Sequence, residues 1–280
     1  MKYPDIDVDI RDVQLVELEL LLEFDSICRK HGIPYQLFAG TLLGAIRHNG
    51  FIPWDDDIDV CMLRKDYDNF IAVCNEDLDE KKYFLQTCFS DPRAIVQFAK
   101  LRKNNTTFIN KIDNDKSTHT GIYIDIFPLD NVKPGTMAGI FQLFLFKFLY
   151  ALTTSTVRER VLRAHNKITV ITRYLMYLVM KIIPKRCVDK AIQKVMVMFK
   201  GDDTKYVCHL TNGITRERFN RYLRESSKFY DIVEWEFEGY LFPVPANYHD
   251  VLTRNFGDYM TLPPEDKRFP HHGIIKVEFD

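Results

Sequence analysis

The chain contains the stretch Phe51-Ile52-Pro53-Trp54-Asp55-Asp56-Asp57-Ile58-Asp59-Val60-Cys61-Met62, in which four carboxylates fall within five positions. Like charges this close repel one another, so the cluster costs stability unless cations neutralise it. Apart from its two Asp residues, the segment 57–62 is apolar and predicts a buried strand. Side chains alternate along a strand, so Asp57 and Asp59 should project to one side, roughly 6.5–7 Å apart. Two carboxylates at this spacing are typical ligands for one or two hard cations.

A glycine-rich segment, Gly40-Thr41-Leu42-Leu43-Gly44, lies just upstream and predicts a turn that opens a short helix. Backbone N–H groups at the start of a helix point outward and favour anions. We therefore expect Gly40 and Thr41 to bind phosphate through backbone N–H and hydroxyl groups; an ordinary helix cap is the alternative. A phosphate-binding turn followed by an Asp-x-Asp strand is typical of a metal-dependent phosphoryl or nucleotidyl transferase.

A second apolar strand is predicted over 121–128, and it contains one carboxylate, Asp125. An isolated ionised Asp inside a buried strand would be very costly. The residue is reasonable if it faces the same cations as Asp57 and Asp59. The alternative is an Asp at an exposed strand edge.

Three basic residues are candidates for binding substrate phosphates. Arg47 follows the short helix and could bind phosphate oxygens in bidentate fashion, although a solvated surface arginine fits its position nearly as well. Lys100 and Arg102 alternate to one face near a strand end and are secondary candidates for a diphosphate. His271 and His272, in a tail predicted to be irregular, could reach the site or stay solvated.

Composition excludes some classes of function. The chain has 280 residues and a formal net charge of −1, so no global basic field favours nucleic acid. Its six cysteines show no CxxC pairing, and we interpret them as reduced, mostly buried residues of a cytosolic protein. The acidic N-terminus lacks the apolar core of a secretory signal.

Other elements follow from local patterns. An amphipathic helix is predicted from about Asp12 to Lys30, ended by Gly32. The remaining predictions are strands at 35–39, 83–88, 95–101 and 106–109, helices at 64–74, 215–230 and 248–256, and an extended segment at 240–245.

The segment 134–200 has a different character, with two very apolar helical stretches at 137–152 and 168–183. Each approaches the length of a membrane span, but Lys147 and Arg173 near their middles argue against simple spans. We expect either a hairpin on an anionic membrane surface or helices packed on the core or on a second subunit. Basic residues are frequent around both stretches: Arg158, Arg160, Arg163, Lys167, Lys181, Lys185 and Arg186.

Three motifs in this order resemble the LicD family, which includes bacterial cholinephosphotransferases and fukutin-type ribitol-phosphate transferases. The first is Gly40 to His48 followed by Gly50 to Asp59, and the second is Gly121 to Asp130. The third comprises Val244-Pro245, Tyr248, Leu252-Thr253, Phe256 to Met260 and Leu262 to Pro264. Phe256 departs from the pattern, which has tyrosine there.

The resemblance implies an α+β nucleotidyltransferase fold, a small mixed sheet flanked by helices. We expect a catalytic core at 1–133, a helical insertion at 134–200 that contacts membrane or acceptor, and a C-terminal extension at 201–280 that packs on the core.

The resemblance also implies a reaction: transfer of a phospho-alcohol from a CDP-alcohol, with CDP-choline expected first, to a hydroxyl of a cell-surface glycan or its lipid-linked precursor. Asp57, Asp59 and Asp125 would hold Mg²⁺, or alternatively Mn²⁺, and Asp125 would take the acceptor proton. Asp55 and Asp56 are either outer ligands or a polar start of the strand. Such an enzyme would work in the cytoplasm, at the inner face of the membrane if it associates peripherally.

Three alternatives stay open. The same site could use a nucleoside triphosphate and release pyrophosphate, the chain could be a non-catalytic nucleotide-binding scaffold, or it could be embedded in a membrane. Trp54 could stack on cytosine or contact a quaternary ammonium, or belong to the core.

Overall fold

The protein is described by a computed structural model that covers residues 1–4, 6–110, 117–156, 167–212, 215–270 and 273–279. Within these residues a mixed sheet of seven strands has the order β1-β2-β6-β4-β3, with β7 and β8 attached at the far end of β6. β2 and β6 run parallel, and the other neighbours run antiparallel. The strands are β1 (Gln36–Leu37), β2 (Asp59–Leu63), β3 (Tyr83–Gln86), β4 (Ala99–Lys103), β6 (Tyr123–Val132), β7 (Tyr206–Cys208) and β8 (Arg224–Glu225). The predicted α+β class is confirmed.

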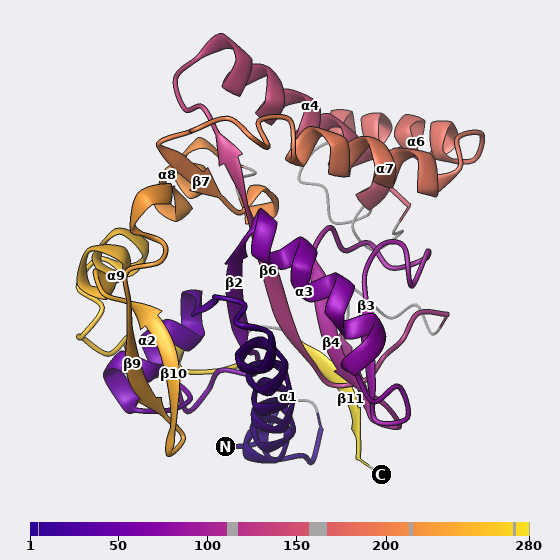
Figure 1. The fold of residues 1–280 in the computed structure, drawn as a ribbon. Coiled ribbons are helices and arrows are strands. Elements are labelled where there is room, and N and C mark those ends of the chain that lie inside the picture. The colour runs from indigo at the N-terminus through magenta and orange to yellow at the C-terminus, as the bar shows by residue number, and fades with distance from the viewer. Residues whose placement is uncertain (5, 111–116, 157–166, 213–214, 271–272, 280) are drawn as a thin grey trace.

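Two helices, α1 (Ile10–His31) and α3 (Arg64–Asp77), cover one face of this sheet (Figure 1). Leu20, Phe24 and Phe70 from these helices pack with sheet residues such as Ile124 and Ile126, all fully buried. α1 begins at an N-cap, Asp9, whose carboxylate accepts the N–H of Arg11, and ends at Gly32 in the left-handed conformation, as predicted.

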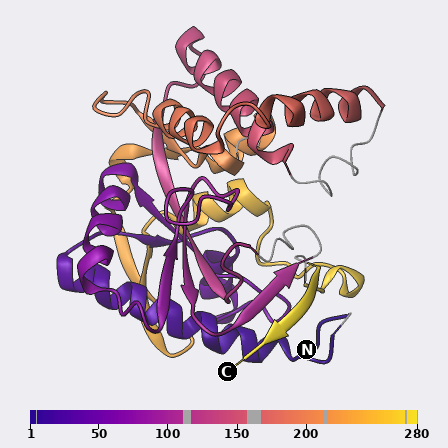
Figure 2. The ribbon, with the colours of Figure 1, turned by 90° about the vertical axis from the view of Figure 1, so that its right-hand side faces the viewer.

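A smaller group of elements packs beside β1 and β2. It consists of α2, α9 and the hairpin of β9 and β10, which contact one another or β1. On the other side of the molecule, β11 pairs with β5 (Figure 2). The bounds are α2 (Ala39–His48), α9 (Tyr248–Phe256), β9 (Ile232–Phe237), β10 (Tyr240–Pro245), β5 (Thr107–Asn110) and β11 (Ile274–Glu278).

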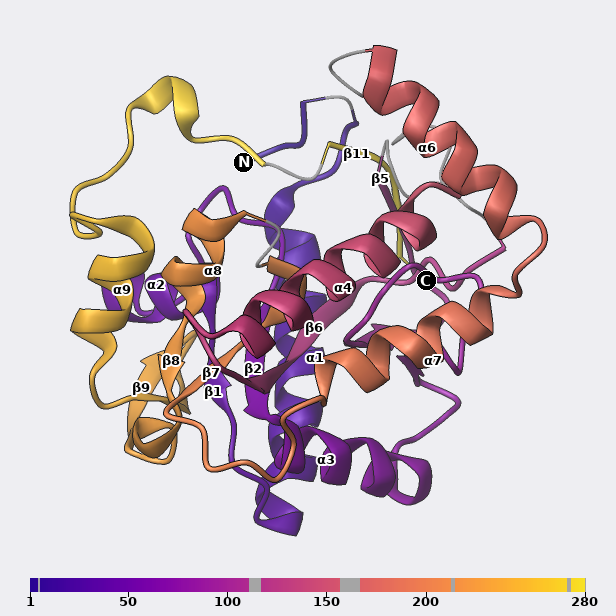
Figure 3. The same cartoon turned by 90° about the horizontal axis from the view of Figure 1, so that it is seen from above.

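Three helices form a layer beyond the C-terminal end of β6 (Figures 1 and 2): α4 (Met137–Thr154), α6 (Lys167–Met180) and α7 (Lys185–Met196). Seen from above, they lie over the rest of the chain (Figure 3). The layer has its own apolar cluster, to which Phe146, Ile192 and Met196 contribute together with Val132 at the end of β6.

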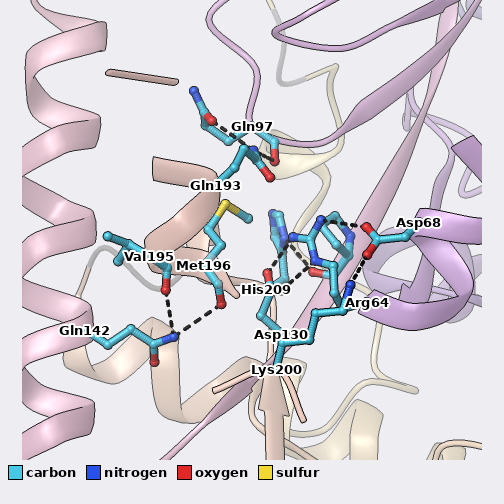
Figure 4. Close-up of polar contacts among 11 residues, drawn as sticks. Arg64, Asp68, Gln97, Asp130, Gln142, Gln193, Val195, Met196, Lys200 and His209 are labelled. Carbon is cyan, nitrogen blue, oxygen red and sulfur yellow. Dashed lines mark hydrogen bonds and ion pairs between the residues drawn. The ribbon is translucent and has the colours of Figure 1, made fainter. Parts of the chain in front are cut away.

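Buried polar contacts fasten this layer (Figure 4). Gln142 of α4 donates through Nε2 to the carbonyl oxygens of Val195 (3.1 Å) and Met196 (3.3 Å) at the end of α7. Gln97, from the segment before β4, donates to Asp189 Oδ1 at 2.9 Å. These bonds add to other contacts of the same groups, because Asp189 also pairs with Lys185 (2.7 Å) and the Val195 carbonyl also accepts the N–H of Met198 (3.2 Å).

A buried ion pair lies near these contacts of the helical layer (Figure 4). Arg64, the first residue of α3, donates to both carboxylate oxygens of Asp130 on β6, at 2.6 and 2.8 Å. Both side chains are buried. The pair therefore joins α3 to the central strand in a geometry that fixes both elements.

Several predictions about local structure were wrong. β2 begins at Asp59, so Asp57 lies in the preceding loop. The helix predicted at 215–230 is the short α8 (Arg216–Tyr222), followed by β8 and a 3-10 turn. β9 was not predicted, and the tail expected to be irregular contains β11.

All six cysteines are free thiols, as expected, and Cys187 alone among them is exposed. Arg158, Arg160, Arg163, His271 and His272 lie outside the described residues.

Candidate active site

Asp59, Asp125 and Lys100 form a row across three adjacent strands. Asp59 of β2 is the register partner of Asp125 on β6, and Asp125 is the partner of Lys100 on β4. Lys100 donates from Nζ to Asp125 Oδ1 at 2.6 Å, and its ammonium lies 3.4 Å from the ring centroid of Tyr123. Because β6 is central and Asp125 is only 9% exposed, the alternative of an exposed strand edge is wrong.

The acidic loop before β2 is held by α1 and β6. The amide of Gln14 donates to the carbonyl oxygens of Asp55 (2.9 Å) and Ile52 (3.4 Å). The N–H of Asp125 donates to the carbonyl of Ile58 at 2.8 Å. Asp57 therefore approaches the row of Asp59 and Asp125 from a loop rather than from the strand.

Glu17 is a buried carboxylate that sequence reasoning missed. It lies one turn after Gln14 on α1, is 1% exposed, and its Oε2 has no hydrogen-bond partner among the described residues. Burial raises the pKa of Glu17 well above its usual range, and the charges of Asp57 and Asp56 raise this pKa further. Gln14 and Glu17, three residues apart on an otherwise apolar helix face, are the signal that could have revealed it.

The acidic groups of the site raise one another's pKa. Burial raises the pKa of Asp59 well above its usual range, and the neighbouring charges of Asp57 and Asp125 add to this. Burial also raises the pKa of Asp125, although Lys100 opposes the shift. A cation bound nearby would favour the ionised carboxylates and reverse these shifts.

The donors available are all oxygens, which suits a hard cation such as Mg²⁺. In the described part of the chain, no three acidic, histidine or cysteine side chains are already gathered around one point. Metal binding by Asp57, Asp59 and Asp125 therefore stays a prediction, supported by carboxylates that raise one another's pKa and by the chemistry of the donors.

The first turn of α2 lies at the cleft. Ala39 begins the helix with φ +42°, a left-handed conformation that costs an L-residue roughly 1–2 kcal/mol and is often found at functional sites. The N-cap, Phe38, makes no side-chain capping bond, so helical N–H groups at this end remain available. A Cβ at Gly40 would lie 2.6 Å from Asp55 Oδ2, so any other residue there would displace the Asp55 carboxylate.

Thr41 lies behind this turn. Its Oγ1 accepts the N–H of Asp59 at 2.8 Å, and the residue is buried. Its hydroxyl thus joins α2 to the start of β2, and contact between this side chain and phosphate stays a prediction.

Gly40, Asp57 and Asp59 border a cleft of about 500 Å³, whereas Thr41 and Asp125 are not among its lining residues. Its walls come from α2, the acidic loop, α8 and the segment after α9. The lining residues are Ala39, Gly40, Leu43, Arg47, Ile52, Trp54, Asp55, Asp57, Asp59, Tyr222, Phe256, Asp258, Tyr259, Thr261 and Pro263. Four of them, Phe256, Asp258, Tyr259 and Pro263, belong to the C-terminal motif, which the sequence showed as a motif without indicating that it lines the site.

The predicted basic residues take different positions. Arg47 lines the cleft, half-buried, and donates from Nη1 to the carbonyl of Tyr259 at 2.8 Å. Burial lowers its pKa, and the charge of Arg268 lowers it further. Lys100 and Arg102 are not in the cleft wall: Arg102 donates to Gln86 Oε1 (2.7 Å) and to the carbonyl of Gly121 (2.6 Å). Their contact with a diphosphate stays a prediction.

Trp54 lines the cleft with one ring face near a cation. The guanidinium carbon of Arg268 lies 5.6 Å from the ring centroid, and His48 meets the ring edge-on at 6.4 Å. Trp54 is partly buried and packs against the main apolar core while it also lines the cleft. Its indole ring is thus able to attract a positively charged group in the cleft.

The fold and this site define a nucleotidyltransferase-type domain. Residues 32–149 match the family model described as LicD/FKTN/FKRP, nucleotidyltransferase domain. Over 269 residues the chain is 32% identical to the lipopolysaccharide cholinephosphotransferase LicD of Haemophilus influenzae, covering 94% of this chain and 96% of that protein. The chain belongs to the LicD family.

Shorter similarities involve two uncharacterized proteins. A protein of Rickettsia typhi is 40% identical over 55 residues, or 20% of this chain and 18% of that protein. A protein of Rickettsia prowazekii is 42% identical over 48 residues, or 17% of this chain and 18% of that protein.

Proposed function

We propose that this protein transfers phosphocholine from CDP-choline to a hydroxyl of a cell-surface glycan, or of its lipid-linked precursor, in the presence of Mg²⁺. Its near full-length similarity to a lipopolysaccharide cholinephosphotransferase supports a LicD-type phosphotransferase. The structural observation that carries the proposal is the row of Asp59, Asp125 and Lys100 next to a cleft that also contains the start of α2.

Phosphoryl transfer needs alignment and charge neutralisation more than covalent chemistry. In the proposed reaction the acceptor hydroxyl oxygen bonds to the phosphorus of the phosphocholine group. The bond from that phosphorus to the bridging oxygen breaks, and CMP leaves with this oxygen. Asp125 accepts the hydroxyl proton, a role that suits a buried carboxylate whose pKa is raised.

The other residues orient the donor. Ala39 and Gly40 at the start of α2 line the cleft together with Arg47, and their N–H groups and its guanidinium would bind diphosphate oxygens. Asp57 and Asp59 would hold Mg²⁺, which when bound supplies positive charge to the diphosphate. Lys100 keeps Asp125 in place and partly balances its charge.

The choline headgroup would bind at Trp54. Its ring already lies beneath the Arg268 guanidinium, which stands where a quaternary ammonium could bind in the same cation–π arrangement. Asp55 and Asp258 line the same cleft and place negative charge near that position.

A thermal-shift panel with a matched transfer assay tests the proposal. The ligands are CDP-choline, CDP-ethanolamine, CDP-glycerol, CDP-ribitol, CTP and ATP, each with and without Mg²⁺; CMP release is followed with phosphocholine-free lipopolysaccharide as acceptor. A ligand at about 100 times its Kd adds about 2.7 kcal/mol of stability, which is a shift of a few degrees. We expect a Mg²⁺-dependent shift and CMP release with CDP-choline.

Asp59→Asn should abolish both signals, and Asp203→Asn, the same change at an exposed loop position, should leave them intact. Shifts with CTP or ATP alone would favour nucleotidyl transfer instead. A chain that binds none of these ligands would be a scaffold, and the proposal would be wrong.

A further inference from the structure

The outer sides of α4 and α6 are apolar and exposed. On α4 the exposed residues recur every third or fourth position, and the same spacing holds along α6 and the turn after it. We call these residues the apolar helical face: Met137, Ile140, Phe141, Phe144 and Phe148, with Ile168, Ile171, Leu175, Leu178, Val179 and Ile182, each 39–85% exposed. α4 and α6 contact each other at the outside of the molecule (Figures 1 and 3). Soluble surfaces normally expose such residues singly, so a gathering of this size indicates a partner.

The inner side of the same helices is already packed. Phe146 and Gln142 of α4 are buried against α7, and Met176 and Met180 of α6 pack on the same apolar cluster. α4 is long and apolar enough to cross a membrane by length and composition, yet only 28% of it is buried. Its lateral packing on α7, through the Gln142 amide, fits a helix that lies along a surface better than one that crosses it.

The positive charge of residues 133–188 indicates what kind of partner would bind there. Residues 133–188 contain ten Lys or Arg and a single acidic residue, Glu159, in a chain whose net charge is −1. Lys181 and Arg186 are exposed at the end of α6 and the start of α7. A second copy of this chain would bring the same positive charge to the contact and be repelled. An apolar partner that carries negative charge at its surface would match both the exposed apolar side chains and the excess of basic residues.

We propose that α4 and α6 lie flat in the interfacial region of a membrane rich in anionic lipids, with the apolar helical face turned toward the acyl chains and Lys181 and Arg186 at the headgroups. Asp125 and Val132, which meets the layer, are seven positions apart on β6, roughly 23 Å of strand. The apolar helical face is thus separate from the cleft, and membrane binding by it does not depend on the proposed reaction.

Vesicle co-sedimentation of the full chain tests this proposal. Wild type is mixed with vesicles of phosphatidylcholine alone or of phosphatidylcholine with phosphatidylglycerol, at low and high salt. We expect more of it to sediment with the anionic vesicles at low salt than at high salt, since salt screens the charge attraction but not the apolar contact.

Two pairs of variants separate the contributions. Phe144→Ser with Ile171→Ser should abolish binding, whereas Leu241→Ser, at an equally exposed apolar residue of β10, should not. Lys181→Glu with Arg186→Glu should weaken binding roughly thirtyfold or more, at about 1 kcal/mol for each basic residue lost. Lys65→Glu with Lys81→Glu, the same charge change at exposed positions of the core, should have little effect.

Each variant should keep its melting temperature and its thermal shift with nucleotide, because the changed side chains are exposed and far from the cleft. The proposal would be wrong if the wild-type protein did not sediment with anionic vesicles. It would also be overturned by equal losses in the control variants, by a concentration-dependent dimer that the Phe144 and Ile171 changes disrupt, or by vesicle binding that resists high salt and alkaline extraction as a spanning helix would.

Discussion

At the scale of single residues, the site contains several acidic groups whose charges are only partly balanced. Lys100 pairs with Asp125, while Glu17 has an oxygen without a hydrogen-bond partner in the part of the chain that the structure describes, and Asp59 has a raised pKa. Such an arrangement destabilises the protein without cations. Function explains its presence better than stability does, because burial of unpaired charge is otherwise avoided.

Trp54 gives a test of headgroup recognition. Trp54→Ala removes the ring that would contact the quaternary ammonium, so KM for CDP-choline should rise between about two- and thirtyfold, the equivalent of roughly 0.5–2 kcal/mol. KM for CDP-glycerol, whose headgroup is uncharged, should change less. Initial rates with both donors provide the measurement. An equal rise for both donors would show that Trp54 shapes the cleft without recognising the ammonium.

His209 predicts acid sensitivity. It is fully buried against Phe127, with Nδ1 donating to the carbonyl of Pro128 and Nε2 bonded to the Thr211 hydroxyl. Burial lowers the pKa of His209 to about 3. The unfolded chain binds a proton below its ordinary pKa of about 6.5 and the folded chain does not, so stability falls as the pH drops from 6.5 toward 3.

His209→Gln should remove this loss. Chemical denaturation at pH 7 and pH 4.5 should show that wild type loses roughly 2–3 kcal/mol more than the variant over this interval. His249→Gln, the same change at an exposed histidine of α9, serves as control. A wild-type loss that His209→Gln does not reduce would contradict the assignment of a neutral buried imidazole.

At the scale of elements, α3 and β6 are joined by the Arg64 and Asp130 pair. Asp130→Asn leaves the Arg64 charge buried without its carboxylate, and we expect a loss of roughly 3–5 kcal/mol in the free energy of unfolding. Arg64→Met combined with Asp130→Leu should recover most of that loss, because no charge is then buried. Urea denaturation provides the measurement.

The exposed pair of Arg221 and Glu217 on α8 is the control. Glu217→Gln should cost about 0.5 kcal/mol or less, since the pair is solvated. If Asp130→Asn and Glu217→Gln lowered the free energy of unfolding by the same amount, burial would not be the cause of the Asp130 effect.

At the scale of the whole molecule, the sheet and the helical layer differ in how firmly they are packed. The residues of β6 from Ile124 to Asp130 are buried, whereas α6 exposes most of its apolar residues and packs mainly through Met176 and Met180. Segments with few buried contacts open at low free energy.

Hydrogen exchange should therefore show faster exchange at 168–180 than at 123–132 in aqueous buffer. Anionic vesicles should slow exchange in α6 and leave β6 unchanged, because α6 gains an apolar environment there. Phosphatidylcholine vesicles are the matched control. Uniform protection of both segments in buffer would show that the layer is part of one cooperative unit with the sheet.

Local sequence patterns and motifs predicted much of the fold and part of the candidate site. The family, the α+β class, α1 with its Gly32 end, α9 and the apolar helices of the layer all followed from spacing and motif residues. The strand of Asp59 and the buried strand of Asp125 were expected for the same reason, because an Asp inside an apolar run is visible in the chain itself.

Tertiary structure decided which residues meet. The pairing of Lys100 with Asp125, the approach of Gln14 and Glu17 to the acidic loop, and the place of Asp258 and Tyr259 in the cleft wall join segments far apart in the chain. Periodicity shows which face of an element is apolar, but not which other element covers it, because that depends on the packing of the whole chain. For the same reason, the sequence by itself determined that α4 and α6 are apolar helices, and only the structure showed that their outer sides are left uncovered.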